Sequence, residues 1–312
     1  VRALGVCGGY TNHMWDLPRL MGHDEFRPDF EVEVAGVNHL SFILRGRHRG
    51  RDLFAMLGEH LTPQWRPPRL TTEAHRHLRA HIRYALRRLH WLFNRFGTVI
   101  FSTEGDGMAH VFYEDMYERG RESRRRGRRP YNMRQAAAAG RAARERLDAE
   151  FATLAAGDRL PDGLWDSATQ PDRRFHRLDE DATVRAARAL AAGSGLDIVA
   201  SHTNRGTAVR GFTDRTVLEY SQRLGRDGLC ARGDLAVPPA FHGLIAGLAE
   251  HQTLLADAIA TEDPRLLFQA FHAYPVFQNT RASRALFREL LVINADEISP
   301  RFQAARDYAT AR

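Results

Sequence analysis

Hydrophobic and polar positions alternate with a period of two in several short stretches of this chain. Phe30, Val32 and Val34 are separated by glutamates, which is typical of a strand with one buried face. Gly36 interrupts this run before the next apolar stretch begins. Strands are expected in "VRALGVC" (1–7), "FEVEV" (30–34), "LSFIL" (40–44), "TVIF" (98–101), "LDIVASH" (196–202) and "RTVLEYSQRL" (215–224). The polar stretch "RGRHRGRD" (45–52) is expected to be a turn.

Other stretches place apolar residues three or four positions apart, which predicts helices. Between Thr71 and Phe96 five apolar residues follow this spacing, and Gly97 is placed to end the helix. Further helices are expected at 14–21 and 134–156, and from about Pro239, Pro264 and Arg281. The clearest linker is the stretch from Gly157 to Pro171. This mixture predicts an α+β domain with helical insertions.

The sequence lacks the usual phosphate-binding signatures. Neither a G-x-G-x-x-G turn after a strand nor a P-loop occurs, so we expect no dinucleotide to be held by these residues alone. Two cysteines among 312 residues suit a reducing compartment. With no apolar stretch of about 20 residues and no signal peptide, we expect a cytoplasmic protein without a membrane partner.

The formal net charge is +7, and all 45 basic residues are arginines. Abundant alanine accompanies them, which indicates GC-rich codon usage rather than a basic binding face. The densest run, Glu118 to Asn132, lacks interleaved aromatic residues and any known nucleic-acid motif. We therefore expect Arg119 to Arg129 to be an exposed, poorly ordered segment and expect no nucleic-acid partner.

Cys7 and His39 are the first candidates for chemistry. Each follows an expected strand beside a glycine, and the helix expected after Cys7 would favour the thiolate. A thiolate and an imidazole suit a borderline divalent cation and leave positions open for water or substrate. The alternative is that both are ordinary core residues.

Two further loops carry polar groups. "STEGDGMAH" gathers Glu104, Asp106 and His110 between glycines, where they could act as general acid and base or simply shape a turn. "SHTNRG" offers His202 and Asn204, for which turn chemistry is the leading interpretation. His75, His77, His81 and His90 lie among arginines and are expected on a helix surface, although His77 and His81 have the i, i+4 spacing of metal ligands.

Taken in order, four motifs resemble the catalytic part of glycoside hydrolase family 4, the NAD-dependent glycosidases related to lactate and malate dehydrogenases. They are "GVCGGY", "AGVNHL", "STEGDGMAH" and "NRGTAVRGFTDRTVLEY", followed by a "GDLAVPPAFHG" ending. The resemblance runs nearly from end to end. It implies a lactate dehydrogenase C-terminal-like domain with mixed or antiparallel strands, covering residues 1–312 with a helical and basic-loop insertion at about 114–170.

The resemblance also implies ligands and substrate contacts. Cys7 and His39 would bind a divalent metal, usually manganese, while Asn38 and Asn204 would contact the sugar. NAD would accept hydride from C3 of the sugar and later return it, and the metal would polarise the resulting carbonyl. The expected partners are a glycoside and further copies of the same chain.

A base must remove the C2 proton before the aglycone leaves by elimination, an exception to the two-carboxylate scheme. The resemblance makes Asp106 the first choice for this base, followed by His110 and Tyr113. It also favours an α-galactosidase or α-glucosidase.

Two departures from the family bear on activity. Family members carry a nucleotide-binding domain before the metal cysteine, and this domain is absent here, so we expect the chain alone to be inactive. Gly8 stands where the family has Asp, Asn or His. The alternative function is a catalytically silent remnant, or an oligomerisation or regulatory subunit that keeps the fold.

Overall fold

The structure is a computed structural model of the 312-residue chain. It describes residues 11–37, 39–72, 76, 78–103, 107–108, 111–112, 133–157, 182–275 and 280–310. The strand expected at residues 1–7, the linker after Gly157 and the basic stretch Arg119 to Arg129 lie outside these residues.

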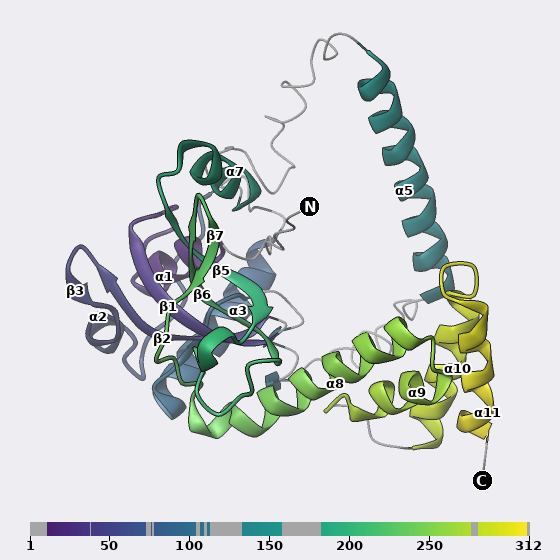
Figure 1. The fold of residues 1–312 in the computed structure, drawn as a ribbon. Helices are drawn as coiled ribbons and strands as arrows, with labels where there is room; N and C mark the ends of the chain where they lie inside the picture. The colour runs from purple at the N-terminus through teal and green to yellow at the C-terminus, as the bar shows by residue number, and fades with distance from the viewer. Residues whose placement is uncertain are drawn as a thin grey trace.

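An antiparallel sheet forms the centre of the larger part of the molecule (Figure 1). Its strands are β1 (Phe30–Val37), β2 (Leu40–His48), β3 (Arg51–Asp52), β4 (Val99–Ile100), β5 (Leu196–Thr203), β6 (Val217–Gly225) and β7 (Gly228–Ala231). The order is β3-β2-β1-β6-β5, while β4 pairs with β2 and β7 pairs with β6. Every one of these pairs is antiparallel, which confirms the expected α+β class.

The helices divide between the sheet and a second, helical part of the molecule (Figure 1). They are α1 (His13–Leu20), α2 (Leu53–His60), α3 (Arg79–Phe96), α5 (Met133–Ala156), α7 (Ala182–Ala192), α8 (His242–Thr261), α9 (Pro264–Ala273), α10 (Arg281–Ile293) and α11 (Ala305–Thr310). Short 3-10 turns are η4 (Arg205–Thr207), η5 (Pro239–Phe241) and η6 (Pro300–Ala304). Within the described residues, no helix is long and apolar enough to cross a membrane.

Two expected boundaries are wrong. The helix expected from Thr71 begins at Arg79, because the backbone N–H groups of Thr71 and Thr72 bind the Asp24 carboxylate instead. The polar stretch expected as a turn continues β2 as far as His48, and the chain reverses only beyond it, before β3. The start expected at about Pro239 is confirmed, since η5 begins there and α8 continues from His242.

Two separate hydrophobic clusters hold the elements together. The larger cluster joins α1, α3 and the sheet, and its largest fully buried side chains include Tyr220, Phe42 and Met14. The smaller cluster, around Phe287 and Phe302, joins α9, α10 and the C-terminal turns. Helix α8 packs on β1 and β6 and also on α9, so it connects the sheet to the helical part (Figure 1).

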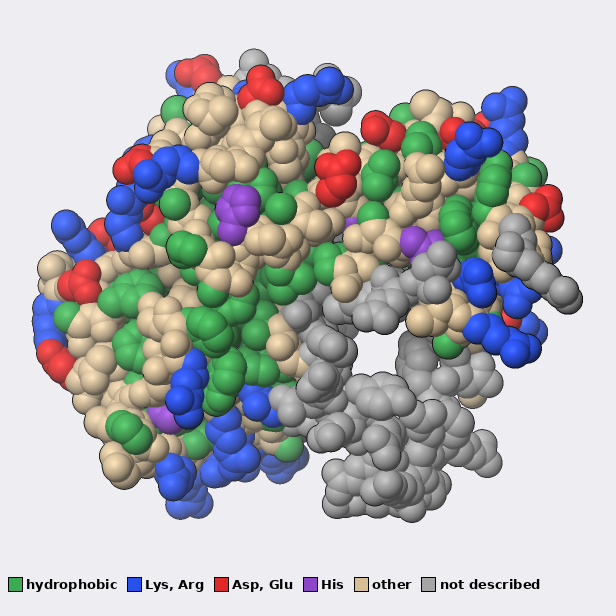
Figure 2. Space-filling view, turned by 90° about the horizontal axis from the view of Figure 1, so that it is seen from below, with side chains coloured by type: hydrophobic (Ala, Val, Ile, Leu, Met, Phe, Trp, Pro, Cys, Tyr) green, Lys and Arg blue, Asp and Glu red, His purple; other side chains and the backbone are tan. Residues whose placement is uncertain are grey.

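The start of helix α5 lies against the helical part that contains α10, and the rest of α5 leads away from it (Figure 1). Three of its arginines make these contacts: Arg134 pairs with Glu289, Arg144 pairs with Glu297, and Arg141 donates to a backbone carbonyl of α10. On the face shown in Figure 2, hydrophobic side chains occupy the middle, and arginines with acidic residues among them lie around the edges. Along the lower edge of this view, however, the arginines have no acidic residues among them (Figure 2).

Candidate functional site

The loop between β1 and β2 contains two residues, and His39 is the second of them. Val37 pairs with Leu40, so Asn38 and His39 form the whole loop, which we call the hairpin tip. His39 has a φ of 62°, the left-handed conformation that the second loop residue of a type I′ hairpin adopts. Asn38 itself lies outside the described residues. The strand-end position expected for His39 is confirmed.

A buried carboxylate holds the hairpin tip from the neighbouring strand. The backbone N–H of His39 donates to Oε2 of Glu219 over 3.2 Å, and the Ser41 hydroxyl donates to the same oxygen. Glu219 lies on β6 and is only 4% exposed. These contacts stabilise a backbone conformation that non-glycine residues adopt infrequently.

The "STEGDGMAH" segment contacts the hairpin tip at Gly107. It follows β4, and the backbone N–H of Phe101 donates to the carbonyl of Ser41 over 2.7 Å. A Cβ added to Gly107 would lie 2.3 Å from the backbone oxygen of His39. Only a glycine can therefore occupy this position without movement of the loop. Glu104, Asp106, His110 and Tyr113 lie outside the described residues.

The first turns of α1 join the same segment. The Asn12 amide donates to the Ser102 hydroxyl over 3.2 Å, and the Thr103 hydroxyl donates to the Asp16 carboxylate over 2.6 Å. Burial raises the pKa of Asp16, although the Arg19 charge and the Thr103 hydrogen bond oppose this effect. Helix α1 thus anchors the segment close to where it meets the hairpin tip.

The described residues do not by themselves form a metal site. They contain no group of three or more His, Cys, Asp or Glu side chains that could hold a metal ion. His39 lies at a fixed hairpin tip, and the second expected ligand, Cys7, lies outside the described residues. An imidazole together with a thiolate is a donor set that suits a borderline divalent cation. The pairing of Cys7 with His39 stays a prediction.

The side chain of Asn204 is fully buried and is used within its own loop. Its amide donates to the carbonyls of Val209 and Phe212, and its oxygen accepts from the backbone N–H of Val209. These three bonds hold the loop that follows β5. The side chain of the preceding histidine, His202, contacts Thr203. In this structure the direct role of Asn204 is to shape the loop, as the turn interpretation expected.

The two described histidines of the arginine-rich stretch lie on α3. His81 is exposed, and His90 stacks on Trp65 and bonds to the carbonyl of Thr62. His75 and His77 lie outside the described residues, so the i, i+4 pair stays untested.

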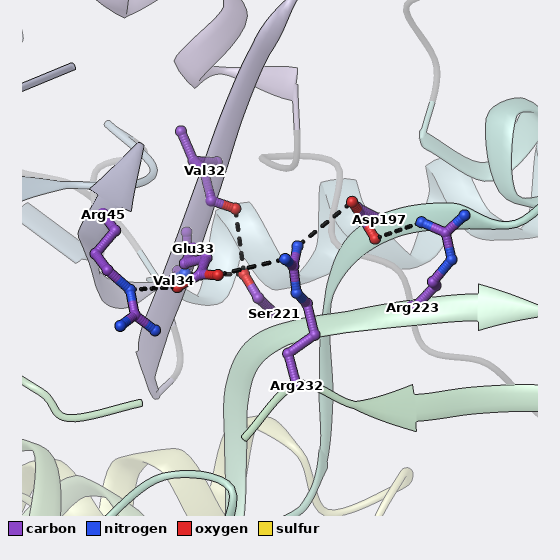
Figure 3. Close-up of polar contacts among 8 residues, drawn as sticks. All are labelled: Val32, Glu33, Val34, Arg45, Asp197, Ser221, Arg223 and Arg232. Atoms are coloured by element: carbon purple, nitrogen blue, oxygen red, sulfur yellow. Dashed lines mark hydrogen bonds and ion pairs between the residues drawn. The ribbon is translucent and has the colours of Figure 1, made fainter. Parts of the chain in front are cut away.

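A cavity of about 600 Å³ lies against the first half of β1, at the other end of that strand from the hairpin tip. Here β1 separates from β6, because the two strands pair only at Ala35 and Gly36. The Ser221 hydroxyl fills the gap by bonding to the N–H of Val34 over 2.8 Å and to the carbonyl of Val32 over 3.4 Å (Figure 3).

Alternating charges cross this gap in the sheet (Figure 3). Arg232 pairs with Glu33 on β1 over 3.3 Å and with Asp197 on β5 over 3.4 Å. Arg45 pairs with Glu33 over 2.5 Å, and Arg223 pairs with Asp197 over 3.0 Å. These arginines and carboxylates pair with one another across the strands. The cavity is also lined by Glu31, Arg47, Asp52 and Arg185. The hairpin tip is the candidate site because it contains His39.

Sequence reasoning missed Glu219, Ser41 and Asp16. A signal was present for Glu219, because the stretch "VLEYS" places a glutamate among apolar residues within an expected strand. Such a position indicates a buried carboxylate with partners. The sequence alone does not say which strand supplies those partners.

Comparison with known proteins identifies a domain and a fold. Residues 34–277 match the model of the family 4 glycosyl hydrolase C-terminal domain. A search of curated proteins finds no match to this sequence.

Solved structures with a similar fold include three glucosidases. One is a 6-phospho-α-glucosidase from gut microorganisms in complex with NAD and Mn²⁺, with 18% identity, a TM-score of 0.66, and coverage of 94% of this chain and 61% of that chain. Another is a 6-phospho-β-glucosidase from Thermotoga maritima with NAD and glucose-6-phosphate, with 15% identity, a TM-score of 0.60, and coverage of 95% and 61%. A putative glucosidase from Bacillus subtilis has 18% identity, a TM-score of 0.60, and coverage of 93% and 63%. This chain therefore spans about three-fifths of the length of these proteins.

Proposed function

Since this chain belongs to family 4 of the glycosyl hydrolases, with its C-terminal domain at residues 34–277, we propose that it forms the sugar- and metal-binding part of a glycosidase. The observation that supports this most is the hairpin tip. His39 is fixed by Glu219, and the segment containing Gly107 lies directly against it. A fixed imidazole beside a loop that carries a carboxylate and a histidine suits catalysis on a bound sugar.

His39 and Cys7 are proposed to hold a divalent cation, with manganese as the first choice. When bound, the cation supplies Lewis acidity to a sugar oxygen, and NAD supplies an acceptor for hydride. The similar 6-phospho-α-glucosidase contains both groups. We propose that NAD is held by a nucleotide-binding domain, because the sequence of this chain contains no dinucleotide fingerprint.

The chain's own residues then orient the sugar and move protons. Asn38, next to His39, is proposed to contact the sugar, and Asn204 to hold the loop beside it. Asp106 is the proposed base for the C2 proton, with His110 and Tyr113 as the alternatives. This choice is supported by Gly107, the residue after Asp106, because its backbone packs on His39. A base on this segment would therefore be close to a sugar bound at the hairpin tip.

We propose an α-linked hexoside of the glucose or galactose type as the substrate. Because the similar structures are named as 6-phospho-glucosidases of both anomers, the substrates tested should include α and β glycosides with and without a 6-phosphate. We also propose that the protein forms homo-oligomers and is located in the cytoplasm.

The experiment joins this chain to the nucleotide-binding domain of a family 4 enzyme and measures hydrolysis in heavy water. We expect turnover that requires both NAD and a divalent cation, with deuterium at C2 of the product because the base removes that proton. The chain alone should hydrolyse nothing. Product without C2 deuterium, or hydrolysis without NAD, would contradict the mechanism. A joined protein that binds both cofactors but turns over none of the glycosides would favour a silent or regulatory subunit.

A further inference from the structure

The cavity beside the first half of β1 lies in a gap within the sheet. Residues 30–33 of β1 all line it, as do residues 196–199 of β5. Because successive side chains of a strand point to opposite faces, a cavity lined by consecutive residues reaches both faces of the sheet. The gap exists because β1 pairs with β6 only at Ala35 and Gly36, while β7 pairs with β6 further along the strand.

The lining of this cavity combines apolar and charged side chains. Its apolar members include Phe30, Val32 and Ile198, and the described residues add four arginines and four carboxylates. The volume of about 600 Å³ is in the range of pockets that hold small molecules. The cavity therefore has the size and the mixed lining of a small-molecule site.

Ion pairs within the lining disfavour a charged ligand. Arg232 lies 3.3 Å from Glu33 and 3.4 Å from Asp197, so one guanidinium bridges carboxylates of two strands (Figure 3). Glu33 also pairs with Arg45. An anion bound at these arginines would meet the carboxylates, and a cation bound at the carboxylates would meet the arginines. The balance of charge therefore favours a neutral ligand.

The same charged groups keep the capacity to bind a ligand through hydrogen bonds. Within the described part of the chain, Arg45 uses only its Nε, in the bond to Glu33, which leaves its two Nη groups as donors. The side chains of Arg232 and Asp197 are 40% and 51% exposed. Because ion pairs this exposed contribute little stability, a ligand can bond to them in place of water at little cost.

This combination fits an uncharged ligand that carries several hydroxyl groups. A hydroxyl can accept from a guanidinium while it donates to a carboxylate, and the C–H groups of a sugar ring can pack on apolar side chains such as Val32 and Ile198. We propose that the cavity is a second binding site, at the other end of β1 from the hairpin tip, that takes a neutral ligand of the sugar class. It consists of described residues and requires neither a metal ion nor NAD.

The test is saturation-transfer NMR on the full chain, with D-glucose as the probe and with neither metal nor NAD added. We expect D-glucose to bind. Arg232→Met keeps the length of the side chain but removes its donors, so the affinity should fall by about tenfold or more. Arg223→Met is the matched control, because Arg223 pairs with the same Asp197 over 3.0 Å but does not line the cavity. Its affinity should stay within about twofold of wild type.

Two further arms test the charge of the ligand and the place where it binds. Inorganic phosphate should bind to wild type more weakly than D-glucose does. Glu33→Gln removes the carboxylate shared by Arg45 and Arg232, so its affinity for phosphate should rise by about tenfold. His39→Ala changes the hairpin tip and not the cavity, so D-glucose should still bind to this variant.

Several results would overturn the proposal. They are a wild-type chain that binds no D-glucose, equal affinity in Arg232→Met and Arg223→Met, and loss of D-glucose binding in His39→Ala, which would place the sugar at the hairpin tip. Phosphate that binds more tightly than D-glucose would overturn the neutral ligand. Thermal unfolding shows whether each variant is folded, and Glu33→Gln with phosphate still decides if Arg232→Met does not fold. None of these measurements depends on glycosidase activity, so they stand apart from the proposed function.

Discussion

At the scale of single residues, the candidate site depends on close contact between two backbone segments. Position 107 requires glycine, because a Cβ atom there would lie 2.3 Å from the backbone carbonyl oxygen of His39. Gly36 is equally constrained, because an added Cβ would lie 2.1 Å from the carbonyl of Leu40. Both glycines therefore allow close packing at the hairpin tip. Gly36 lies in β1, and Gly107 lies in the segment that follows β4.

Gly107→Ala should therefore damage activity more than folding. The added methyl group must push the segment away from the hairpin tip, and a shift of about 1 Å at a reacting centre can cost about 100-fold in rate. We expect kcat/KM of the joined enzyme to fall by about this factor. Gly140→Ala on α5 is the control, because an added Cβ there meets nothing within 4 Å. Its activity should not change, and its stability should rise by up to about 1 kcal/mol. Equal loss of activity in both variants would contradict this account.

The sequence allowed His39 to be placed correctly but not the residues that support it. His39 lies three residues after Gly36, at the end of an alternating stretch, so its position at a strand end follows from local pattern alone. Glu219 is 180 residues away, and its contact with His39 depends on β1 and β6 being neighbours in the sheet. Strand order is a property of the whole fold, so no local pattern could reveal this contact.

At the scale of elements, one buried ion pair fixes the irregular segment between α2 and α3. The side chains of Arg19 and Asp24 are each 3% exposed, and Nε of Arg19 lies 2.7 Å from Oδ1 of Asp24. Asp24 also accepts the backbone N–H groups of Thr71 and Thr72 over 2.6 and 2.7 Å. Burial tends to raise the pKa of Asp24, but the hydrogen bonds from Thr72 and Arg19 outweigh it and hold the pKa below its ordinary value.

Asp24→Ala should destabilise the protein by about 3–5 kcal/mol, because it removes the carboxylate bound to the buried Arg19 and the acceptor of the Thr71 and Thr72 N–H groups. The measurement is urea unfolding at neutral pH. Since the pKa of Asp24 is lowered by folding, its contribution is present above pH 3.8 and decreases as the pH falls below that value. Asp197→Ala is the matched control, because its ion pairs are about half exposed and should contribute about 1 kcal/mol or less. A smaller effect for Asp24 than for Asp197 would contradict the assignment.

Elements with strong local signals were predicted, and those defined by tertiary contacts were not. Gly97 ends α3 in the left-handed conformation, as the sequence indicated. Helix α2 was missed because its start depends on the Asp52 side chain, which accepts the N–H of Ala55 after a polar stretch that suggested a turn. Strand β7 has four residues and is defined by its pairing with β6. Short elements of this kind carry too few residues to show a period.

At the scale of the whole molecule, the second hydrophobic cluster contains a histidine that should make stability depend on pH. His272 lies among the rings of Phe268, Phe271 and Phe287, and neither ring nitrogen has a hydrogen-bond partner within the described part of the chain. Burial lowers the pKa of His272 below its ordinary value of 6.5, and the charge of Arg284 lowers it further. Folding therefore favours the neutral ring.

A group whose pKa is lowered on folding contributes stability above the unfolded pKa and loses it as the pH falls. The free energy of unfolding should accordingly decrease below pH 6.5, because the unfolded state takes up a proton that the folded state resists. Chemical denaturation of His272→Phe between pH 7.5 and 5 should show a weaker pH dependence than wild type. His23→Gln, at an exposed position, should follow wild type. Identical pH dependence in wild type and His272→Phe would refute this role.

The most direct test of the account is a crystal structure of the protein grown with Mn²⁺, in which the anomalous signal locates the ion. We predict one Mn²⁺ at the hairpin tip, with Cys7 Sγ and a ring nitrogen of His39 both at bonding distance, about 2.0–2.3 Å by comparison with other divalent sites. A separation of more than about 6 Å between Cys7 Sγ and the His39 ring, with no rotamer that closes it, would contradict the metal site. An ion bound elsewhere would contradict it equally.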